Sequence, residues 1–395
     1  MNADFLIIGG GIIGLSMARV MSQSGKVVLI EKDFCGAHAS GRNSAVVHAG
    51  IYYPNGSSKA LHSVKGNALI TEYCKSHGIK IQNIGKIIAP ANDQEAEELK
   101  SLYDRGIKNG APLKLIDYHE AKSIEPRIIP QQRYIWSPST SIADNKGVIK
   151  ALKQECEEKG VKIVEGCKFL SKADNLSTTI VETSKFPIEA KFVINCAGMY
   201  VDKIAKQFGF GLNYEILPII GLYLDGNPGI KGFNTLIYPC PSPDLGLGVH
   251  TTNTVHGVYK LGPTATPALW REQYAWNHGF SLSEVLSSSN LYLRCLFSKN
   301  WKMYIKLFLR EARKYQKSNI VADCNKLVSG VVREDYKHWG IPAMFPQLVD
   351  KRTYTFVDDF AVEGDEKSIH FLNIVSPGWT SSLSFTQEIS KRILK

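Results

Sequence analysis

Three glycines and one acidic residue near the N-terminus have the types and spacing of a nucleotide-binding turn. Gly9, Gly11 and Gly14 fit the pattern Gly-x-Gly-x-x-Gly, and Glu31 follows Gly14 by 17 residues. In such a turn the first glycine permits a tight bend, the second lets the backbone approach a pyrophosphate, and the third lets a helix pack close to a strand. The acid is placed to accept a hydrogen bond from a ribose 2′-hydroxyl, which indicates an adenosine without a 2′-phosphate.

The segments around the turn predict the elements that position it. Residues 5–8 and 27–30 are apolar runs typical of buried parallel strands, and residues 15–24 predict the helix between them. Free N–H groups at the start of that helix, together with its dipole, favour bound phosphate. An ordinary glycine-rich turn is the alternative, but the order strand, turn, helix, strand and acid argues against it. We therefore expect this end of the chain, with Glu31 and Lys32, to bind FAD or NAD.

Composition limits the class of protein. The 395 residues allow two domains or one large interleaved domain, and an apolar fraction of 44% suits a globular core. The eight cysteines form no Cys-x-x-Cys pair, so neither a disulfide framework nor a zinc site is expected, and the predicted location is a reducing compartment, the cytoplasm. We expect no metal. Because the first strand begins by about residue 4, we also expect no signal or transit peptide.

The chain is basic, with a net charge of +10 and a pI near 9.0. This balance is compatible with an anionic cofactor and a small anionic substrate, with a membrane surface, or with nucleic acid. No nucleic-acid-binding motif accompanies the charge, so the first two are favoured.

Residues 40–60 combine several polar side chains with many small residues. Such a stretch suits a segment that passes beneath a ligand, and a loop followed by a helix cap is the alternative. Its positions match the pattern Ser-x-Arg-Asn-Ser-x-Val-x-His-x-Gly-Ile-Tyr-Tyr, followed by Ser-x-Lys-Ala. The matching residues are Ser40, Arg42, Asn43, Ser44, Val46, His48, Gly50, Ile51, Tyr52, Tyr53, Ser57, Lys59 and Ala60.

This stretch resembles the flavoprotein family of L-2-hydroxyglutarate dehydrogenases, within the D-amino-acid-oxidase-like superfamily. The resemblance favours FAD over NAD and extends over nearly the whole chain. It implies an α/β fold, in which an FAD-binding Rossmann-like domain of the D-amino-acid-oxidase/glutathione-reductase type is interleaved with an α+β substrate domain built on an antiparallel sheet. The expected FAD-binding domain is 1–80, 141–212 and 325–395, and the expected substrate domain is 81–140 and 213–324. Strand-like runs at 217–224, 235–238, 246–252 and 257–261 are read as the antiparallel sheet.

The resemblance also implies the cofactor contacts. Besides the glycine turn, it places Ser40, Arg42, Asn43 and Ser44 near the flavin. Ala197 and Gly198 follow a strand and resemble a second contact, for which a structural glycine is the alternative. Gly378, Trp379 and Thr380 start a helix whose N-terminus would face the flavin pyrimidine, where negative charge builds up on reduction.

Oxidation of a 2-hydroxy acid needs a base for the hydroxyl proton and cations for the carboxylates. His48 has the pKa range of such a base, although it would instead hydrogen-bond or covalently tether the flavin if it follows some relatives. Tyr53, Lys59 and His250 are the candidates for orienting an anionic substrate. His250 is also readable as a structural histidine at a strand end.

The sequence departs from the family at two basic positions. Relatives have arginine where this chain has Pro342, and arginine or lysine where it has Ile220. Loss of both cations would weaken a dicarboxylate site by several kcal/mol unless it is compensated. We therefore consider three hypotheses for the function: a 2-hydroxy-acid dehydrogenase, an amine or amino-acid oxidase of the same fold, and a diverged FAD-binding protein with weak turnover.

Residues 292–317 mix large apolar side chains with eight basic residues and one acid, Glu311. The segment is readable as a basic amphipathic helix on anionic lipid, or as a helix with a solvated basic face, which we favour. Peripheral membrane contact would favour a quinone over oxygen as electron acceptor, and the sequence leaves that choice open.

Overall fold

The computed structural model describes residues 1–241 and 247–395 and divides into two compact units. Unit 1 comprises Met1–Asn43, Asn145–Pro218 and Met344–Lys395, and unit 2 comprises Ser44–Asp144 and Ile219–Ala343. The expected domain boundaries differ from these units in residues 44–80, 141–144, 213–218 and 325–343, and the assignment of cofactor and substrate to separate domains stays a prediction.

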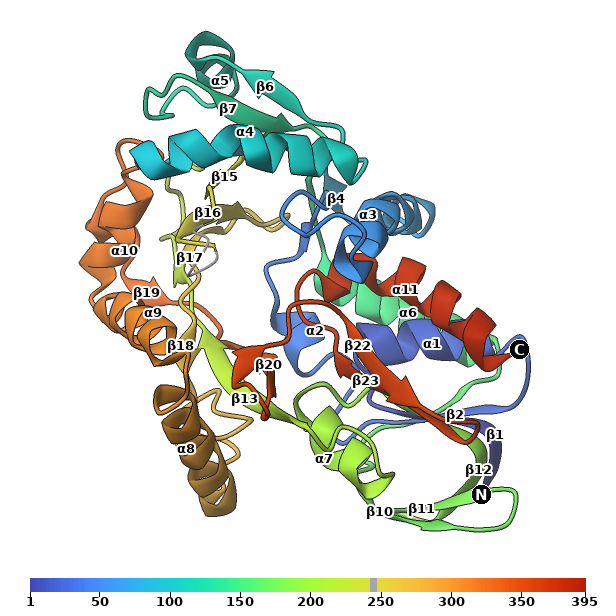
Figure 1. The fold of residues 1–395 in the computed structure, drawn as a ribbon. Coiled ribbons are helices and arrows are strands. Elements are labelled where there is room, and N and C mark those ends of the chain that lie inside the picture. Colours follow the sequence, from blue (N-terminus) through green and yellow to red (C-terminus); the bar gives the residue numbers. More distant parts are fainter. Residues whose placement is uncertain (242–246) are drawn as a thin grey trace. The chain divides into compact units, whose positions relative to one another are not determined.

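The sheet of unit 1 has a parallel core built from apolar segments (Figure 1). β1 (Asn2–Ile8) lies between β12 (Ile188–Asn195) and β2 (Val27–Ile30), and β9 (Lys162–Val164) extends the sheet beyond β2. All four residues of β2 are buried, as expected for a strand covered on both faces. Both strands predicted beside the glycine turn are thus confirmed.

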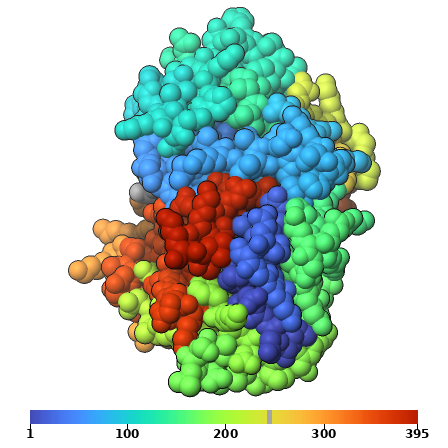
Figure 2. Space-filling view, turned by 90° about the vertical axis from the view of Figure 1, so that its right-hand side faces the viewer, coloured from blue at the N-terminus to red at the C-terminus, as the bar shows by residue number. Residues whose placement is uncertain are grey.

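Helices cover this core. α1 (Ile12–Met21) follows the glycine turn and packs against both α6 (Asn145–Glu158) and α11 (Gly378–Ile393). Figure 2 shows the C-terminal segment in red directly beside the N-terminal segment in blue, in agreement with the contact between α11 and α1. The two ends of the chain therefore build the same part of unit 1.

β12 carries further strands on the edge away from β1. Its first half pairs with β11 (Thr179–Thr183), which forms an antiparallel hairpin with β10 (Phe169–Asp174). Its second half pairs in parallel with β23 (Ser368–Asn373), which is antiparallel to β22 (Ala361–Gly364). The other elements here are α2 (Ala39–Arg42), the 3₁₀ turn η1 (Gly198–Tyr200), α7 (Val201–Gln207) and β21 (Thr355–Phe356), and the unit boundaries fall within β13 (Tyr214–Gly221) and β20 (Ala343–Asp350).

Unit 2 contains several small sheets. One has the order β3 (Val46–Val47), β8 (Ser141–Ala143) and β4 (Ile81–Gln82). A second has the order β15 (Leu236–Pro239), β5 (Lys86–Ala89), β7 (Tyr134–Ser137) and β6 (Lys114–Ile116). A third has the order β16 (His250–Asn253), β17 (Tyr259–Gly262), β14 (Leu224–Asp225) and β19 (His338–Trp339). β18 (Thr266–Pro267) pairs with the end of β13.

The predicted single antiparallel sheet is divided among three sheets, because residues 217–221 belong to β13 in the sheet with β18, and 235–238 belong to the second sheet of unit 2. β15 pairs in parallel with β5, opposite a strand more than a hundred residues earlier in the chain. Residue 246, the first of the predicted strand 246–252, lies outside the described residues, and β16 begins at His250. The third sheet is antiparallel, as the alternating runs predicted.

Several helices of unit 2 begin at side-chain caps. Ser57 accepts from Ala60 N at the start of α3 (Ser58–Ser76), and Asn92 accepts from Glu95 N at the start of α4 (Asp93–Lys108). Asp117 and Glu120 form a capping box at α5 (Tyr118–Ile124). The remaining short elements are α10 (Lys317–Cys324) and the 3₁₀ turn η2 (Arg333–Asp335).

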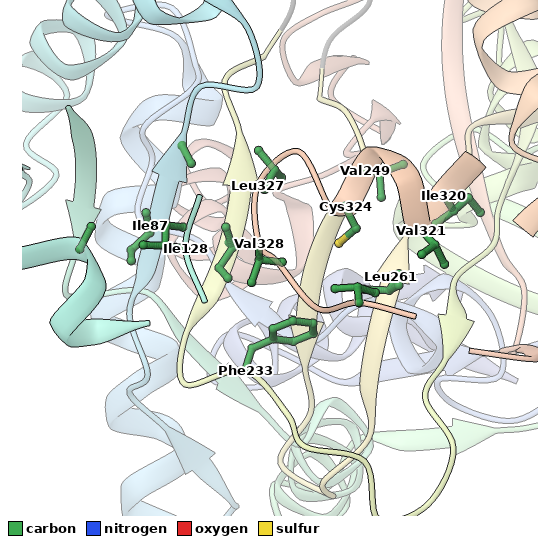
Figure 3. Close-up of a cluster of buried hydrophobic side chains, with 14 of the residues drawn as sticks. Ile87, Ile128, Phe233, Val249, Leu261, Ile320, Val321, Cys324, Leu327 and Val328 are labelled. Atoms are coloured by element: carbon green, nitrogen blue, oxygen red, sulfur yellow. The ribbon is translucent and has the colours of Figure 1, made fainter. Parts of the chain in front are cut away.

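A large hydrophobic cluster joins the second and third sheets of unit 2 to α10. Figure 3 shows Ile87, Phe233, Leu261, Val321 and Val328 within it. Ile87 is fully buried here, so the neighbouring residues of β5 point to the other face of their sheet.

The basic segment 292–317 forms two helices, and the prediction of a single one is wrong. α8 (Leu282–Leu296) and α9 (Trp301–Arg313) are separated by residues 297–300. Both helices and the residues between them expose large apolar side chains. Phe297, between the helices, is 87% exposed, and Leu309 on α9 is 63% exposed. Among the described residues, no helix combines the length and apolarity needed to cross a bilayer.

Candidate active site

The glycine turn of unit 1 has no room for side chains. Gly9 has φ +113°, and a Cβ there would lie 2.5 Å from Cys196 O. A Cβ on Gly14 would lie 1.9 Å from Gly9 O, so the helix can approach the turn only because residue 14 is glycine. Gly11 is less crowded, with Ser40 Oγ 3.1 Å from the Cβ position. The turn thus has the close backbone approach that a diphosphate needs.

Glu31 is held in place at the end of β2. Its Oε2 accepts from Gly10 N at 2.6 Å and its Oε1 accepts from Asp33 N at 3.0 Å. A carboxylate offers about four acceptor positions, so capacity is left for ribose hydroxyls. Lys32 donates to Asp33 at 2.7 Å and lies over the Tyr200 ring, 5.5 Å from its centroid.

Glu31 and Asp33 also approach His38. One ligand atom from each of the three lies within 4.8 Å of the others, a spacing that a metal ion would tolerate. The contacts already present account for these groups, because Asp33 Oδ2 lies 2.7 Å from both Lys32 Nζ and His38 Nε2. The expected absence of a metal stays a prediction.

The segment at α2 is fixed by hydrogen bonds within unit 1. Ser40 Oγ accepts from Ile12 N at 2.9 Å, at the start of α1, and Arg42 Nε donates to Ala37 O at 2.8 Å. Asn43 Nδ2 donates to Ser40 O at 3.0 Å, while Asn145 Nδ2 donates to Asn43 Oδ1 at 3.2 Å. Of the predicted contacts, Ser40 therefore lies at the N-terminus of the helix that follows the glycine turn, and Arg42 and Asn43 are held within the segment around it.

Two further predicted contacts lie at the ends of strands and helices of unit 1. Gly198 has φ +51°, with no atom within 4 Å of a Cβ position, and Ala197 N donates to Asn195 Oδ1 at 3.2 Å. At the start of α11, among the described residues, Trp379 Nε1 and Ser381 Oγ are buried without a hydrogen-bond partner. Buried polar atoms are nearly always paired, so these two atoms are candidates for contact with a ligand. The residues present fit a flavin dinucleotide, and the roles of Gly378 and Thr380 stay a prediction.

In unit 2, His48 follows β3 directly. Asn67 on α3 donates from Nδ2 to the carbonyls of Val47, His48 and Ser139 at 3.1 to 3.2 Å, which holds the main chain around His48. Ala45 just before β3 has φ +58°, a left-handed conformation that costs energy for a residue with a side chain. The segment is thus held in a specific, partly strained conformation.

Lys86 brings a buried charge to the region of His48. The side chain is fully buried at the start of β5, and its Nζ lies 4.6 Å from the centroid of the Tyr52 ring and 4.9 Å from that of Tyr238. Tyr238 stacks on His250 with ring centroids 3.8 Å apart. Burial lowers the pKa of Lys86 to about 7, because the charged form loses its hydration.

The two histidines are neutral at pH 7. Burial of the imidazole, and then the charges of Lys86 and His250, lower the pKa of His48 to about 3. Burial likewise lowers the pKa of His250 to about 3, against the opposing effect of its hydrogen bond to Gly248 O. His250 Nδ1 lies 3.0 Å from Gly248 O, and when Nδ1 carries the proton, Nε2 is the nitrogen that can accept one.

The remaining predicted side chains, Tyr53, Lys59 and Ser44, contact or lie close to the tyrosines around Lys86 and His250. Lys59 is at the start of α3, and its Nζ lies 5.9 Å from the centroid of the Tyr53 ring. The Tyr53 hydroxyl is near enough to raise the pKa of Tyr52 and Tyr238 slightly beyond the dominant effect of their burial. Ser44 hydrogen-bonds Tyr223, opposing the rise that burial causes in the pKa of that tyrosine.

Sequence reasoning missed Lys86. The available signal was a lysine at the head of an otherwise apolar strand, Lys86–Ala89, where a charged side chain is costly unless it has a task. Ile220 and Pro342, at the positions where the resemblance led us to expect cations, are partly buried. Arg333, a basic residue nine positions before Pro342, is exposed on η2.

Comparison with known proteins agrees over the full chain. The family described as "FAD dependent oxidoreductase" matches residues 4–386. An L-2-hydroxyglutarate dehydrogenase of Indibacter alkaliphilus is 32% identical over 100% of both chains. The human mitochondrial L-2-hydroxyglutarate dehydrogenase is 32% identical over 99% of this chain and 88% of its own.

Among solved structures, the L-α-glycerophosphate oxidase of Mycoplasma pneumoniae with FAD bound is similar in fold. It superimposes with a TM-score of 0.78 at 22% identity, covering 100% of this chain and 95% of that one. At this identity the similarity establishes the fold alone.

Proposed function

The chain belongs to the FAD-dependent oxidoreductases and, among them, to the family of the L-2-hydroxyglutarate dehydrogenases, and from that premise we propose that it oxidises a small 2-hydroxy acid such as L-2-hydroxyglutarate. The family and the cofactor predicted from the sequence are confirmed. The observation that carries the substrate proposal is the pair of neutral histidines beside a buried lysine in unit 2.

In this proposal the neutral histidines contact the substrate hydroxyl group, and Tyr53 and Lys59 contact its anionic groups. Bound FAD supplies an acceptor for the hydride that leaves the carbon bearing the hydroxyl group. His48 is neutral at pH 7, because its pKa is lowered to about 3, so a ring nitrogen keeps a lone pair for the substrate hydroxyl group. A pKa this far below 7 makes it a weak base, so the proton moves to it only as the hydride leaves the carbon. His250 Nε2 can accept a hydrogen bond from the same substrate, and Tyr53 and Lys59 are placed to orient its anionic groups.

The cofactor contacts follow from the geometry of unit 1. The diphosphate would lie against Gly9, Gly11 and the N-terminus of α1, and the ribose against Glu31. The flavin would lie against α2 and the start of α11, where Trp379 and Ser381 have buried polar atoms to satisfy.

An anaerobic titration tests the substrate. We expect L-2-hydroxyglutarate to bleach the oxidised flavin band and His48→Ala to keep its FAD while reduction slows by about 10²- to 10⁴-fold. The matched control is His119→Ala, which removes an exposed histidine on α5 and leaves the rate unchanged. Bleaching only by amino acids would favour an amino-acid oxidase, and no bleaching by any candidate would favour a diverged FAD-binding protein.

The same variant settles the other role considered for His48. If the flavin of the native protein stays attached after acid precipitation but that of His48→Ala is released, His48 tethers the cofactor. Unchanged reduction in His48→Ala would exclude it as the base.

We also infer a peripheral contact of this protein with an anionic membrane surface. The exposed apolar residues recur at helical spacing along α8 and α9, and exposed lysines flank them, so the pattern complements a negatively charged bilayer. The apolar residues are Leu286, Leu293, Phe297, Trp301, Ile305, Phe308 and Leu309, and the lysines are Lys299, Lys302 and Lys306. Such a contact favours a quinone as electron acceptor over oxygen, on the cytoplasmic side of a membrane.

Vesicle flotation tests this contact. We expect the protein to float with phosphatidylserine-containing vesicles and less with phosphatidylcholine alone, and Phe297→Ser with Ile305→Ser to abolish flotation. Leu176→Ser is the control, because Leu176 is 98% exposed on the β10–β11 hairpin, away from these helices in sequence. If the protein never floats, it makes no contact with these membranes. If the native protein is a dimer that the double variant dissociates, the apolar residues of α8 and α9 bind a second copy of the chain instead.

A further inference from the structure

Lys86 is the buried charge that the proposed reaction has not yet used. A buried ammonium is normally paired with a carboxylate, because removing it from water without a partner costs several kcal/mol. Among the described residues, Lys86 Nζ has no hydrogen-bond partner. It lies over the faces of the Tyr52 and Tyr238 rings. Cation–π contacts offset only part of the cost of burial.

A second orphaned atom lies in the same group. The Tyr52 hydroxyl is also buried without a partner among the described residues, and the Tyr52 ring is the one that Lys86 faces at 4.6 Å. One unpaired polar group has several explanations, but an unpaired donor beside an unpaired hydroxyl indicates a ligand with acceptor atoms.

We propose that Lys86 and the Tyr52 hydroxyl form a carboxylate-binding subsite for the substrate, in which Lys86 is the cation that binds the carboxylate. The subsite replaces the charge absent at Ile220 and Pro342. This inference rests on the proposed oxidation of a 2-hydroxy acid for its link to catalysis, but not for the binding itself.

The neighbours of Lys86 explain why it binds rather than accepts the proton. A bound carboxylate favours the ammonium form, so Lys86 has no free electron pair in the complex. Its charge also lowers the pKa of His48 and His250, so both imidazoles are neutral and keep a ring nitrogen with a lone pair. Tyr52 and Tyr238 do not compete, because burial raises the pKa of both hydroxyls.

Binding of glutarate tests the subsite without any turnover, because glutarate lacks the hydroxyl to be oxidised. We expect the FAD-loaded protein to bind glutarate and Lys86→Met to bind it about 10- to 100-fold more weakly in calorimetry. Lys122→Met is the matched control, since Lys122 is exposed on α5 over the Tyr118 ring at 5.5 Å, and its affinity is expected to be unchanged.

Proton uptake distinguishes a ligand-binding lysine from a merely structural one. Calorimetry at pH 8 in two buffers of different ionisation enthalpy is expected to show proton uptake on glutarate binding by the native protein. Lys86→Met should lose that uptake, while uptake carried by His48 or His250 would persist in it. The variant should also melt at a higher temperature, because a methionine removes a buried charge; a lower melting temperature with unchanged affinity would assign Lys86 to packing alone.

The possible failures are separable. Equal glutarate affinity and proton uptake in the native protein and Lys86→Met would overturn the subsite, as would a native protein that binds no glutarate but is reduced by a monocarboxylic 2-hydroxy acid. Lys86-dependent glutarate binding without flavin reduction by L-2-hydroxyglutarate would uphold the subsite and reject the proposed reaction.

Discussion

Two buried lysines of unit 2 have opposite surroundings. Lys314, at the C-terminal end of α9, is 2% exposed, and its Nζ lies 2.7 Å from Glu311 Oε1 in the last turn of that helix. Lys86 is equally buried and faces two aromatic rings, without a hydrogen-bond partner among the described residues. The chain thus supplies a counter-ion for one buried ammonium and leaves the other to the aromatic rings.

Both oxygens of the buried Glu311 carboxylate accept hydrogen bonds. Its Oε1 also accepts from Arg310 Nε at 2.9 Å, and its Oε2 accepts from Ala265 N at 2.6 Å, next to the strand β18. Such a closed network fixes α9 against the chain beside it and leaves no acceptor for a ligand. A structural charge is therefore recognised by its complete set of partners, and a binding charge by a missing one.

Removing the counter-ion is expected to have the largest effect. In Glu311→Gln the amide keeps the shape and an acceptor for Ala265 N but leaves Lys314 buried and unpaired. We expect the free energy of unfolding to fall by about 3–5 kcal/mol in urea titrations. Asp104→Asn, which removes the partner of the exposed Lys100, should change it by less than about 0.5 kcal/mol. A loss below about 1 kcal/mol in Glu311→Gln would mean that Lys314 needs no partner, and the comparison would break.

The sequence predicted the dinucleotide turn because its determinants are local. Three glycines, a strand on each side and an acid lie within one stretch of chain, and their spacing alone requires the strand–turn–helix geometry that the structure shows. The family motif in residues 40–60 is local for the same reason.

The Lys86 group could not be predicted in this way. Tyr238 comes near Lys86 because β15 pairs in parallel with β5, in the register that places Leu236 opposite Lys86. Nothing in either segment names the other as its partner, and a lysine at a strand start usually points into water. Glu311 was visible only as the single acid of a basic segment, and its role as a buried counter-ion depends on the break between α8 and α9 that no glycine or proline marks.

The smaller expected effect is a dependence of stability on pH that belongs to Lys86. The pKa of Lys86 is lowered to about 7 in the folded chain, against about 10.4 in an unfolded one. Between these values the unfolded state binds a proton that the folded state does not, so the free energy of unfolding rises with pH, by at most about 1.4 kcal/mol per pH unit. Urea titrations at pH 7, 8 and 9 should show this rise in the native protein and a smaller one in Lys86→Met.

Other groups near Lys86 do not produce this difference. The pKa values of His48 and His250 are lowered to about 3 and those of Tyr52 and Tyr238 are raised, so all four keep their charge state between pH 7 and 9. Lys314 has a lowered pKa as well, but it is present in both proteins and cancels in the subtraction. Saturating glutarate should reduce the rise in the native protein, because the bound carboxylate keeps Lys86 protonated. If the free energy of unfolding rises equally with pH in the native protein and in Lys86→Met, the rise does not come from Lys86. Lys86 would then not differ from Lys314 in the way that the comparison requires.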